Sequence, residues 1–153
     1  MKTVDFLRMK APSSLVFQAA ADVERWPDRL GHYRWVTMRE RWPDGGVVEM
    51  AAWRPFGPAR YPTWWVSRMD IDSARQEVRY QHIEGITRGM DVVWQVVSRG
   101  NETDVTIVHE WAGPRWPLIG GMAADLVIGP VFIHGIASRT LAGIARFVEH
   151  NHG

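Results

Sequence analysis

A histidine on the apolar side of a predicted strand is the residue of this 153-residue chain best suited to proton transfer. In the segment from Thr103 to Trp111, apolar and polar residues alternate, and His109 falls on the apolar parity with Val105 and Ile107. A neutral imidazole there could act as a general acid or base, because histidine titrates near neutral pH. The alternative is a buried histidine whose ring is satisfied by a backbone carbonyl or a neighbouring hydroxyl.

Tryptophan stands out by number, with nine copies in the chain. Each buries on the order of 150–250 Å² and carries an N–H group that needs a partner. The two interpretations are a bulky core and an aromatic wall around a flat ligand, and the second is favoured if several share one face of a sheet. The nine residues are Trp26, Trp35, Trp42, Trp53, Trp64, Trp65, Trp94, Trp111 and Trp116.

Composition and charge argue against several classes of function. Hydrophobic residues make up 46% of the chain and charged residues 23%, a balance typical of globular domains. The net charge is +1 and the basic residues are scattered singly, so nucleic acid is not an expected partner. Without cysteine there is no thiolate or cysteine-zinc chemistry. Because a charged residue precedes any apolar run at the N-terminus, the start of the sequence does not resemble a secretion signal, and we expect a cytoplasmic protein.

Three local features that suggest a membrane span, a metal site or a phosphate site are interpreted otherwise. The segment from Leu118 to Ala137 is apolar over about 20 residues, but it contains a charge and a proline, which favour a buried or pocket-capping segment. His150 and His152 lack a third ligand, so no metal is expected. The Gly85 to Gly89 stretch is not followed by a helix and does not fit a phosphate-binding loop.

The periodicity of apolar residues predicts one α+β domain spanning residues 1–153. Strands are expected at Thr3–Met9, Tyr33–Trp42, Val47–Arg54, Thr63–Ile71, Glu77–Glu84, Met90–Ser98 and Thr103–Trp111. Helices are expected from Ser13 to about Asp22, near Asp28 to Leu30, and from about Val131 to His150. A turn at Pro43-Asp44-Gly45-Gly46 joins the second strand to the third.

These elements predict a curved antiparallel sheet of about seven strands that wraps a long C-terminal helix. A sheet with one apolar face must cover that face, and the last helix is the only predicted element large enough to do so. The two short helices after the first strand would close one end. The expected binding site is a pocket between the sheet and the long helix.

The order of elements and several motifs resemble the START-like helix-grip (SRPBCC) superfamily and, within it, the polyketide cyclase/dehydrase (aromatase/cyclase) branch. The motifs are Asp22 to Pro27, Trp65 to Arg68, Val78 to Gly85 and His109 to Trp111, and the resemblance spans nearly the whole chain. It implies a pocket that holds a poly-β-ketone chain or its cyclised aromatic product. It also implies aldol cyclisation and dehydration, which need an acid/base group and a stabiliser of the enolate oxygen but no cofactor or metal.

The resemblance also implies roles for individual residues. His109 becomes the acid/base group, and Tyr33 matches a tyrosine that hydrogen-bonds a ketone oxygen in aromatase/cyclases. A tyrosine that anchors the start of its strand is the alternative for Tyr33. The residues expected to line the pocket are Trp65, Ser67, Met69, Met90, Trp94, Ile107, Trp111, Ile133, Ile136 and Ala137.

The chain departs from the family pattern at Met69. Cyclases characteristically carry an arginine at this pocket-facing position, and a methionine fills apolar space but cannot stabilise an oxyanion. Arg68 is adjacent but points to the opposite face unless a bulge turns it inward. Arg54, Arg88 and His134 are candidates to replace the missing group.

Two hypotheses from different classes follow from these residues. The first is a cofactor-independent aromatase/cyclase-type enzyme, and the second is a non-catalytic carrier or sensor of a lipid, quinone or aromatic metabolite. Met69 and the apolar Leu118 to Ala137 segment, acting as a lid, favour the second. A protein-interaction module, with the tryptophan-rich surface pairing two chains as a homodimer, is a third interpretation.

Overall fold

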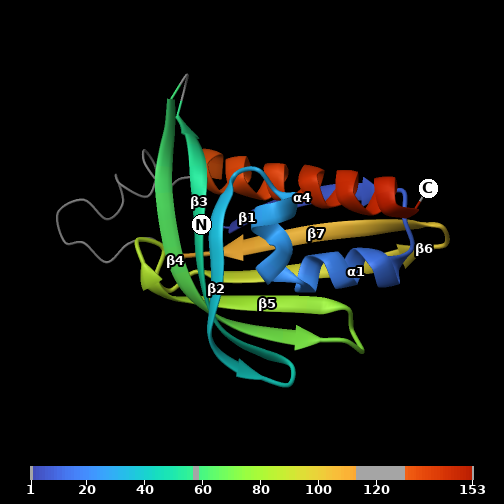
Figure 1. Cartoon of the computed structure of the whole chain (residues 1–153), viewed down its shortest axis with the longest axis horizontal. Helices are drawn as coiled ribbons and strands as arrows, with labels where there is room; N and C mark the ends of the chain where they lie inside the picture. The colour runs from blue at the N-terminus through green and yellow to red at the C-terminus, as the bar shows by residue number, and fades with distance from the viewer. Residues whose placement is uncertain (1, 57–58, 113–129, 153) are drawn as a thin grey trace.

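The structure is a computed structural model that describes residues 2–56, 59–112 and 130–152 (Figure 1). In order along the chain its elements are β1 (Lys2–Met9), α1 (Ser13–Ala21), the 3-10 helix η1 (Val23–Arg25), α2 (Trp26–Arg29), β2 (Tyr33–Trp42), β3 (Gly45–Phe56), β4 (Ala59–Asp72), β5 (Glu77–Gly85), β6 (Asp91–Arg99), β7 (Glu102–Glu110) and α4 (Pro130–His152). The predicted α+β helix-grip architecture is confirmed.

The strands form one seven-stranded antiparallel sheet in the order β1-β7-β6-β5-β4-β3-β2. Strands β2 to β7 follow one another as hairpins, and β1 joins at the far edge, where Lys2 pairs with Glu110 and Met9 pairs with Thr103. The sheet curves around α4, which lies along its inner face (Figure 1). The first strand of the chain is therefore held by the last one.

The predicted bounds differ most at β3 and β4, which are longer than expected at both ends. The prediction treated Gly45 and Gly46 as part of the turn, whereas Gly45 already pairs with Trp42 and only Pro43 and Asp44 make the turn. Glycine fits both positions of the ladder because a Cβ atom would come within 2.0 Å of the carbonyl oxygen of Met69 at Gly45 and within 2.2 Å of that of Glu40 at Gly46.

The second short helix also begins earlier than predicted. It starts at Trp26, directly after the 3-10 turn, and ends at Arg29. Pro27 lies in its first turn, where the missing N–H group costs no helical hydrogen bond. This early start carries Trp26 into the core, where the ring is 2% exposed.

The core lies between the inner face of the sheet and the apolar stripe of α4. Alternate residues of β5 and β6 point inward, and the helix contributes residues at spacings of three and four. The buried residues of these elements include Val78, Tyr80, Val92, Trp94, Val96, Ile133, Ala137, Leu141, Ile144 and Val148. The outer face of β5 and β6 mixes polar side chains with the apolar residues Ile83 and Val97, which are 38% and 47% exposed.

In the described ranges, no helix has both the length and the apolar character that a membrane crossing needs. Residues 118–129 of the predicted pocket-capping segment lie outside the described residues. The rest of that segment, from Pro130, is the start of α4.

Candidate functional site

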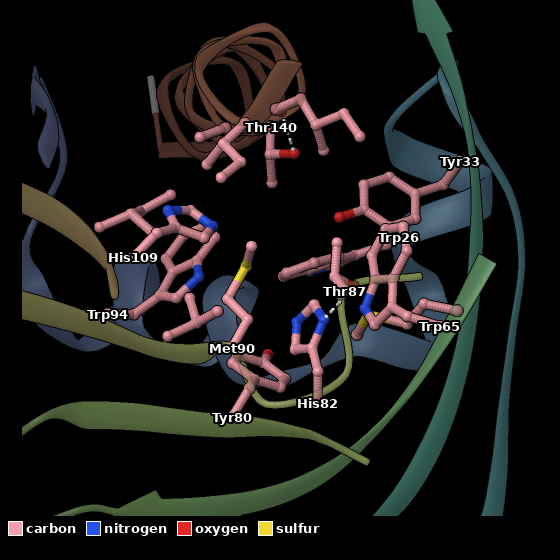
Figure 2. A pocket seen from close by; sticks show the side chains of 16 residues that line it. Trp26, Tyr33, Trp65, Tyr80, His82, Thr87, Met90, Trp94, His109 and Thr140 are labelled. Carbon is pink, nitrogen blue, oxygen red and sulfur yellow. Dashed lines mark hydrogen bonds between the residues drawn. The ribbon is translucent and has the colours of Figure 1, made fainter. Parts of the chain in front are cut away.

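A cavity lies between α4, the inner face of the sheet and the start of β2 (Figure 2). About 70 Å³ of this cavity admits the centre of a water-sized sphere. A buried water needs roughly 10–15 Å³ of such volume, so the cavity as it stands holds about five waters. It is lined by Trp26, Tyr33, Met50, Trp65, Tyr80, His82, Thr87, Met90, Val92, Trp94, Ile107, His109, Ile133, Ile136, Ala137 and Thr140.

Aromatic rings in mutual contact form one wall of this cavity. The ring of Tyr33 lies edge-on to Trp26, with centroids 5.2 Å apart, and edge-on to Trp65, at 6.2 Å. Trp26 also contacts Trp94 at 5.6 Å, and its indole N–H donates to the carbonyl oxygen of Ala19 at 3.0 Å. Because each ring is held by its neighbours, this wall is preformed for a flat apolar ligand.

His109 lies on the lining, on the same inward row of the sheet as Tyr80 and Val92. Burial lowers the pKa of its imidazole to about 4, so the ring is neutral near neutral pH. Its Nδ1 atom is buried and has no hydrogen-bond partner among the described residues. A buried polar atom left unpaired costs about 1–3 kcal/mol, so this position of the imidazole lowers the stability of the fold.

Tyr33 faces the cavity from the start of β2, on the side opposite His109 (Figure 2). Burial raises the pKa of its phenol, and the interaction with the hydroxyl of Thr140 only partly offsets this. Thr140 is fixed in turn, since its hydroxyl donates to the carbonyl oxygen of Ile136 at 2.8 Å and lies 2.9 Å from Nε2 of His32. The phenol therefore stays protonated and can donate a hydrogen bond.

His82 is a second histidine of the lining, and the sequence interpretation did not single it out. Its Nδ1 lies 2.7 Å from the hydroxyl of Thr87, and its ring stacks on Trp65 with centroids 5.7 Å apart and 2° between the planes. Burial, with a smaller contribution from His109, lowers its pKa to about 3. The alternation of Val78, Tyr80 and His82 in β5 was a signal that could have found it.

Tyr80 is a further polar group on the lining that the sequence interpretation missed. Its hydroxyl is buried without a hydrogen-bond partner among the described residues, and burial raises the pKa of the phenol well above its ordinary value. The remaining lining residues outside the predicted set are Trp26, Met50, Thr87, Val92 and Thr140. They lie on different strands, on two helices and in the β5–β6 loop, so no single segment could reveal them.

Most of the predicted pocket residues share this one cavity. Besides His109 and Tyr33, they are Trp65, Met90, Trp94, Ile107, Ile133, Ile136 and Ala137. The long helix, several strands and the β5–β6 loop bring them together.

Ser67, Met69 and Trp111 are buried but lie outside the lining. Met69 is on the inward parity of β4, but it faces a different hollow, beside Val23 and Trp42. The indole N–H of Trp111 donates to the carbonyl oxygen of Arg88 at 3.1 Å. Parity fixes which face of a sheet a residue occupies but not its place along the strand, and the cavity spans only part of the inner face.

Arg68 lies on the outer face of the sheet. The pairing of β4 with β5 does shift register between Val66 and Ser67, but Arg68 remains outside. Its side chain is 58% exposed, lies 3.5 Å from a carboxylate oxygen of Asp70, and stacks over the ring of Trp42 at 5.2 Å. The irregularity therefore leaves no guanidinium in the position that the family arginine would take.

The described lining carries no Asp, Glu, Lys or Arg side chain. Arg88 is exposed, and His134 is 67% exposed and pairs with the buried carboxylate of Asp5. The side chain of Arg54 lies outside the described residues. Nor do three or more His, Asp or Glu residues of the described ranges gather as a metal site would require. The polar groups available to a ligand are thus neutral imidazoles, phenols and hydroxyls.

Residues 9–129 match the family described as polyketide cyclase / dehydrase and lipid transport. The actinorhodin polyketide synthase bifunctional cyclase/dehydratase of Streptomyces coelicolor is 29% identical over 126 residues, which are 82% of this chain but only 39% of that protein. This chain thus spans well under half of that relative.

Two solved structures share the helix-grip fold over nearly their whole length. The Zhui aromatase/cyclase from Streptomyces sp. R1128 has a TM-score of 0.78 at 19% identity, with 100% of this chain and 96% of that chain covered. A protein from Thermus thermophilus has a TM-score of 0.83 at 18% identity, with both chains fully covered. At this identity the likenesses establish the fold, and the family match establishes descent. The chain belongs to the polyketide cyclase / dehydrase and lipid transport family, as the resemblance predicted.

Proposed function

We propose that this chain binds a hydrophobic, aromatic-type small molecule in the cavity and catalyses an aldol cyclisation and dehydration of a poly-β-ketone chain. The observation that carries the proposal is the neutral imidazole of His109 on a lining that also presents the protonated phenol of Tyr33. Family membership supports the substrate class. In this proposal residues 1–153 act as one ligand-binding domain in the cytoplasm, a location that the absence of cysteine supports.

The chemistry needs only groups that the lining provides. The neutral imidazole of His109 takes a proton from a carbon between two carbonyls, while the hydroxyl of Tyr33 donates a hydrogen bond to the enolate oxygen that forms. The enolate carbon then bonds to a second carbonyl carbon, and the resulting alkoxide takes the proton back from the imidazolium. Loss of a further proton and the hydroxyl group as water completes the dehydration.

Burial of His109 has a consequence for the direction of proton transfer. Because the low-polarity surroundings disfavour the imidazolium, the ring returns its proton readily to the alkoxide. The aromatic wall holds the chain folded, so that the two reacting carbons meet. Both features favour a ligand that is already activated between two ketones, where the proton to be removed is acidic.

The test is turnover of a reactive poly-β-ketone mimic, with cyclised product measured by chromatography. His109→Ala should lower the rate by about 10²–10⁴-fold, the usual contribution of an acid/base group, and Tyr33→Phe should lower it by less. His150→Ala, an exposed histidine on α4, is the matched control and should have no effect. Unchanged turnover in His109→Ala, or none in the wild type, contradicts the catalytic proposal.

A non-catalytic carrier of an aromatic or lipid molecule is the second candidate. Met69 in place of the family arginine, and a lining without any charged side chain, favour this function. Native mass spectrometry of the protein as purified separates the two candidates. A bound molecule that remains chemically unchanged on incubation supports the carrier, whereas a cyclised product on the protein supports the enzyme.

A further inference from the structure

We propose that His82 and Thr87 form a recognition site for an uncharged oxygen of the ligand, a ketone or a hydroxyl, and that the lining rejects a carboxylate at this place. This inference rests on the proposed ligand-binding function and adds to it a polar subsite with its own residues. It gives the cavity a hydrogen-bonding subsite in addition to His109 and Tyr33.

The imidazole of His82 is held in one orientation from several sides. Thr87 lies 2.7 Å from Nδ1, and the parallel ring of Trp65 covers one face. The backbone is also fixed, because the N–H of His82 donates to Met90 at 2.9 Å and its carbonyl accepts from Gly89 at 2.8 Å. With Nδ1 engaged, Nε2 is the ring atom left for a ligand, and Figure 2 shows it turned toward the cavity.

The Thr87 hydroxyl allows the His82–Thr87 subsite to act as either a hydrogen-bond donor or an acceptor. When the hydroxyl donates to Nδ1, the proton of the neutral ring sits on Nε2, which then donates to a ketone oxygen. When the hydroxyl accepts from Nδ1–H, Nε2 is unprotonated and accepts from a ligand hydroxyl. The same pair therefore suits a ketone and the hydroxyl derived from it, without any change of charge.

A carboxylate does not fit this subsite. The described lining has no cationic side chain to replace the water that a carboxylate loses on entering, and an unpaired buried charge is very costly. Protonation of His82 would supply a cation, but its burial against Trp65 and its neighbour His109 oppose that. The subsite therefore selects for uncharged ligand oxygens, such as those of a ketone or a hydroxyl.

The test compares three probes of similar shape by isothermal titration calorimetry at neutral pH: 2-methylnaphthalene, 2-naphthol and 2-naphthoate. Wild-type protein should bind the naphthol about five- to tenfold more tightly than the methyl compound, as one net hydrogen bond provides, and should bind the naphthoate most weakly. The ratio of the first two affinities is the quantity of interest, because general damage to the pocket lowers both.

Variants of the pair should change that ratio and leave apolar binding in place. Thr87→Val, which keeps the shape, and His82→Phe, which keeps a ring against Trp65, should bring the ratio close to one. Thr87→Ser should retain the wild-type ratio, since it keeps the hydroxyl. Thr106→Val, on the half-buried part of β7 outside the lining, is the control and should leave the ratio unchanged.

Each result has a separate meaning for the two proposals. If all three probes bind but Thr87→Val keeps the wild-type ratio, or if the naphthoate binds best, the oxygen-recognition site is wrong and the hydrophobic cavity remains. If none of the probes binds the wild-type protein, the proposed binding function itself is contradicted. Should His82→Phe fail to fold, Thr87→Val and Thr87→Ser still decide the question.

Discussion

At the scale of single residues, His82 and His109 are basic groups that the fold keeps uncharged. Burial lowers their pKa values to about 3 and about 4, from an ordinary value of 6.5. Between pH 6.5 and pH 4 the unfolded chain binds protons at these positions and the folded chain does not. The free energy of unfolding should therefore be highest above that window and fall on acidification, by up to about 3 kcal/mol for each histidine.

The prediction is checked by urea unfolding at a series of pH values, followed by circular dichroism. His109→Leu should remove one of these protonations, so its stability should fall less steeply with acidification than that of the wild type. The exposed residue His150 is the control, and His150→Ala should leave the slope as it was. Parallel curves for His109→Leu and wild type would contradict the assignment of a buried, neutral ring.

At the scale of elements, the turn after β5 decides how Thr87 meets His82. Gly85 has a φ angle of +101°, and a Cβ atom there would come within 2.8 Å of the carbonyl oxygen of Trp64. Gly85→Ala should therefore destabilise the protein by about 1–3 kcal/mol and reduce the preference for 2-naphthol over 2-methylnaphthalene. Urea unfolding and calorimetry check the two effects, and a variant with wild-type stability would show that the turn tolerates the change.

The contact of α4 with the segment after α2 depends on a second glycine. A Cβ atom on Gly143 would lie 2.3 Å from Cδ2 of Leu30, a side chain that is 1% exposed. Gly143→Ala gains about 1 kcal/mol of helix propensity but overpacks this contact, which costs typically 1–3 kcal/mol. Thermal unfolding should show a lower midpoint. Gly31→Ala, with no atom within 4 Å of the added Cβ, is the control and should change stability by less than about 0.5 kcal/mol.

The elements were also the part of the structure most open to prediction from sequence. Alternation in β5 to β7 and the helical stripe of α4 are strong patterns, because each element buries one face. The ends of β3 and β4 were harder to predict. Gly45 and Gly46 are typical turn residues, but here they lie within a strand where two backbones come close together. The site was predicted in part, because the alternation of residues along a strand shows which face of the sheet each side chain occupies. The partners Thr87 and His82 could not be assigned, since their contact depends on the conformation of a turn.

At the scale of the whole molecule, the cavity is narrow relative to the ligand that we propose. Room for about five waters does not admit a fused aromatic system until side chains move, and the flexible Met90 is suited to move. Ligand binding should then stabilise the fold according to the ratio of ligand concentration to its dissociation constant, and raise the thermal midpoint accordingly.

Filling the cavity from α4 tests its location. Ala137→Leu places a larger side chain on the lining, so binding of 2-methylnaphthalene should be lost while stability falls by no more than about 3 kcal/mol. Calorimetry with the probe and urea unfolding measure the two effects. Ala142→Leu, on the same helix but outside the lining, is the control and should still bind. Normal binding by Ala137→Leu would place the ligand elsewhere.

The pairing of β1 with β7 sets the order in which the chain can fold. Lys2 meets Glu110 only after more than half of the chain has been synthesised, and α4 emerges after every strand. Until that helix arrives, the tryptophan-bearing inner face of the sheet has no cover, and pairings so distant in sequence form slowly. During synthesis in the cell this partly made sheet is therefore the species most prone to aggregate, and a chaperone that shields its inner face should raise the yield of folded protein.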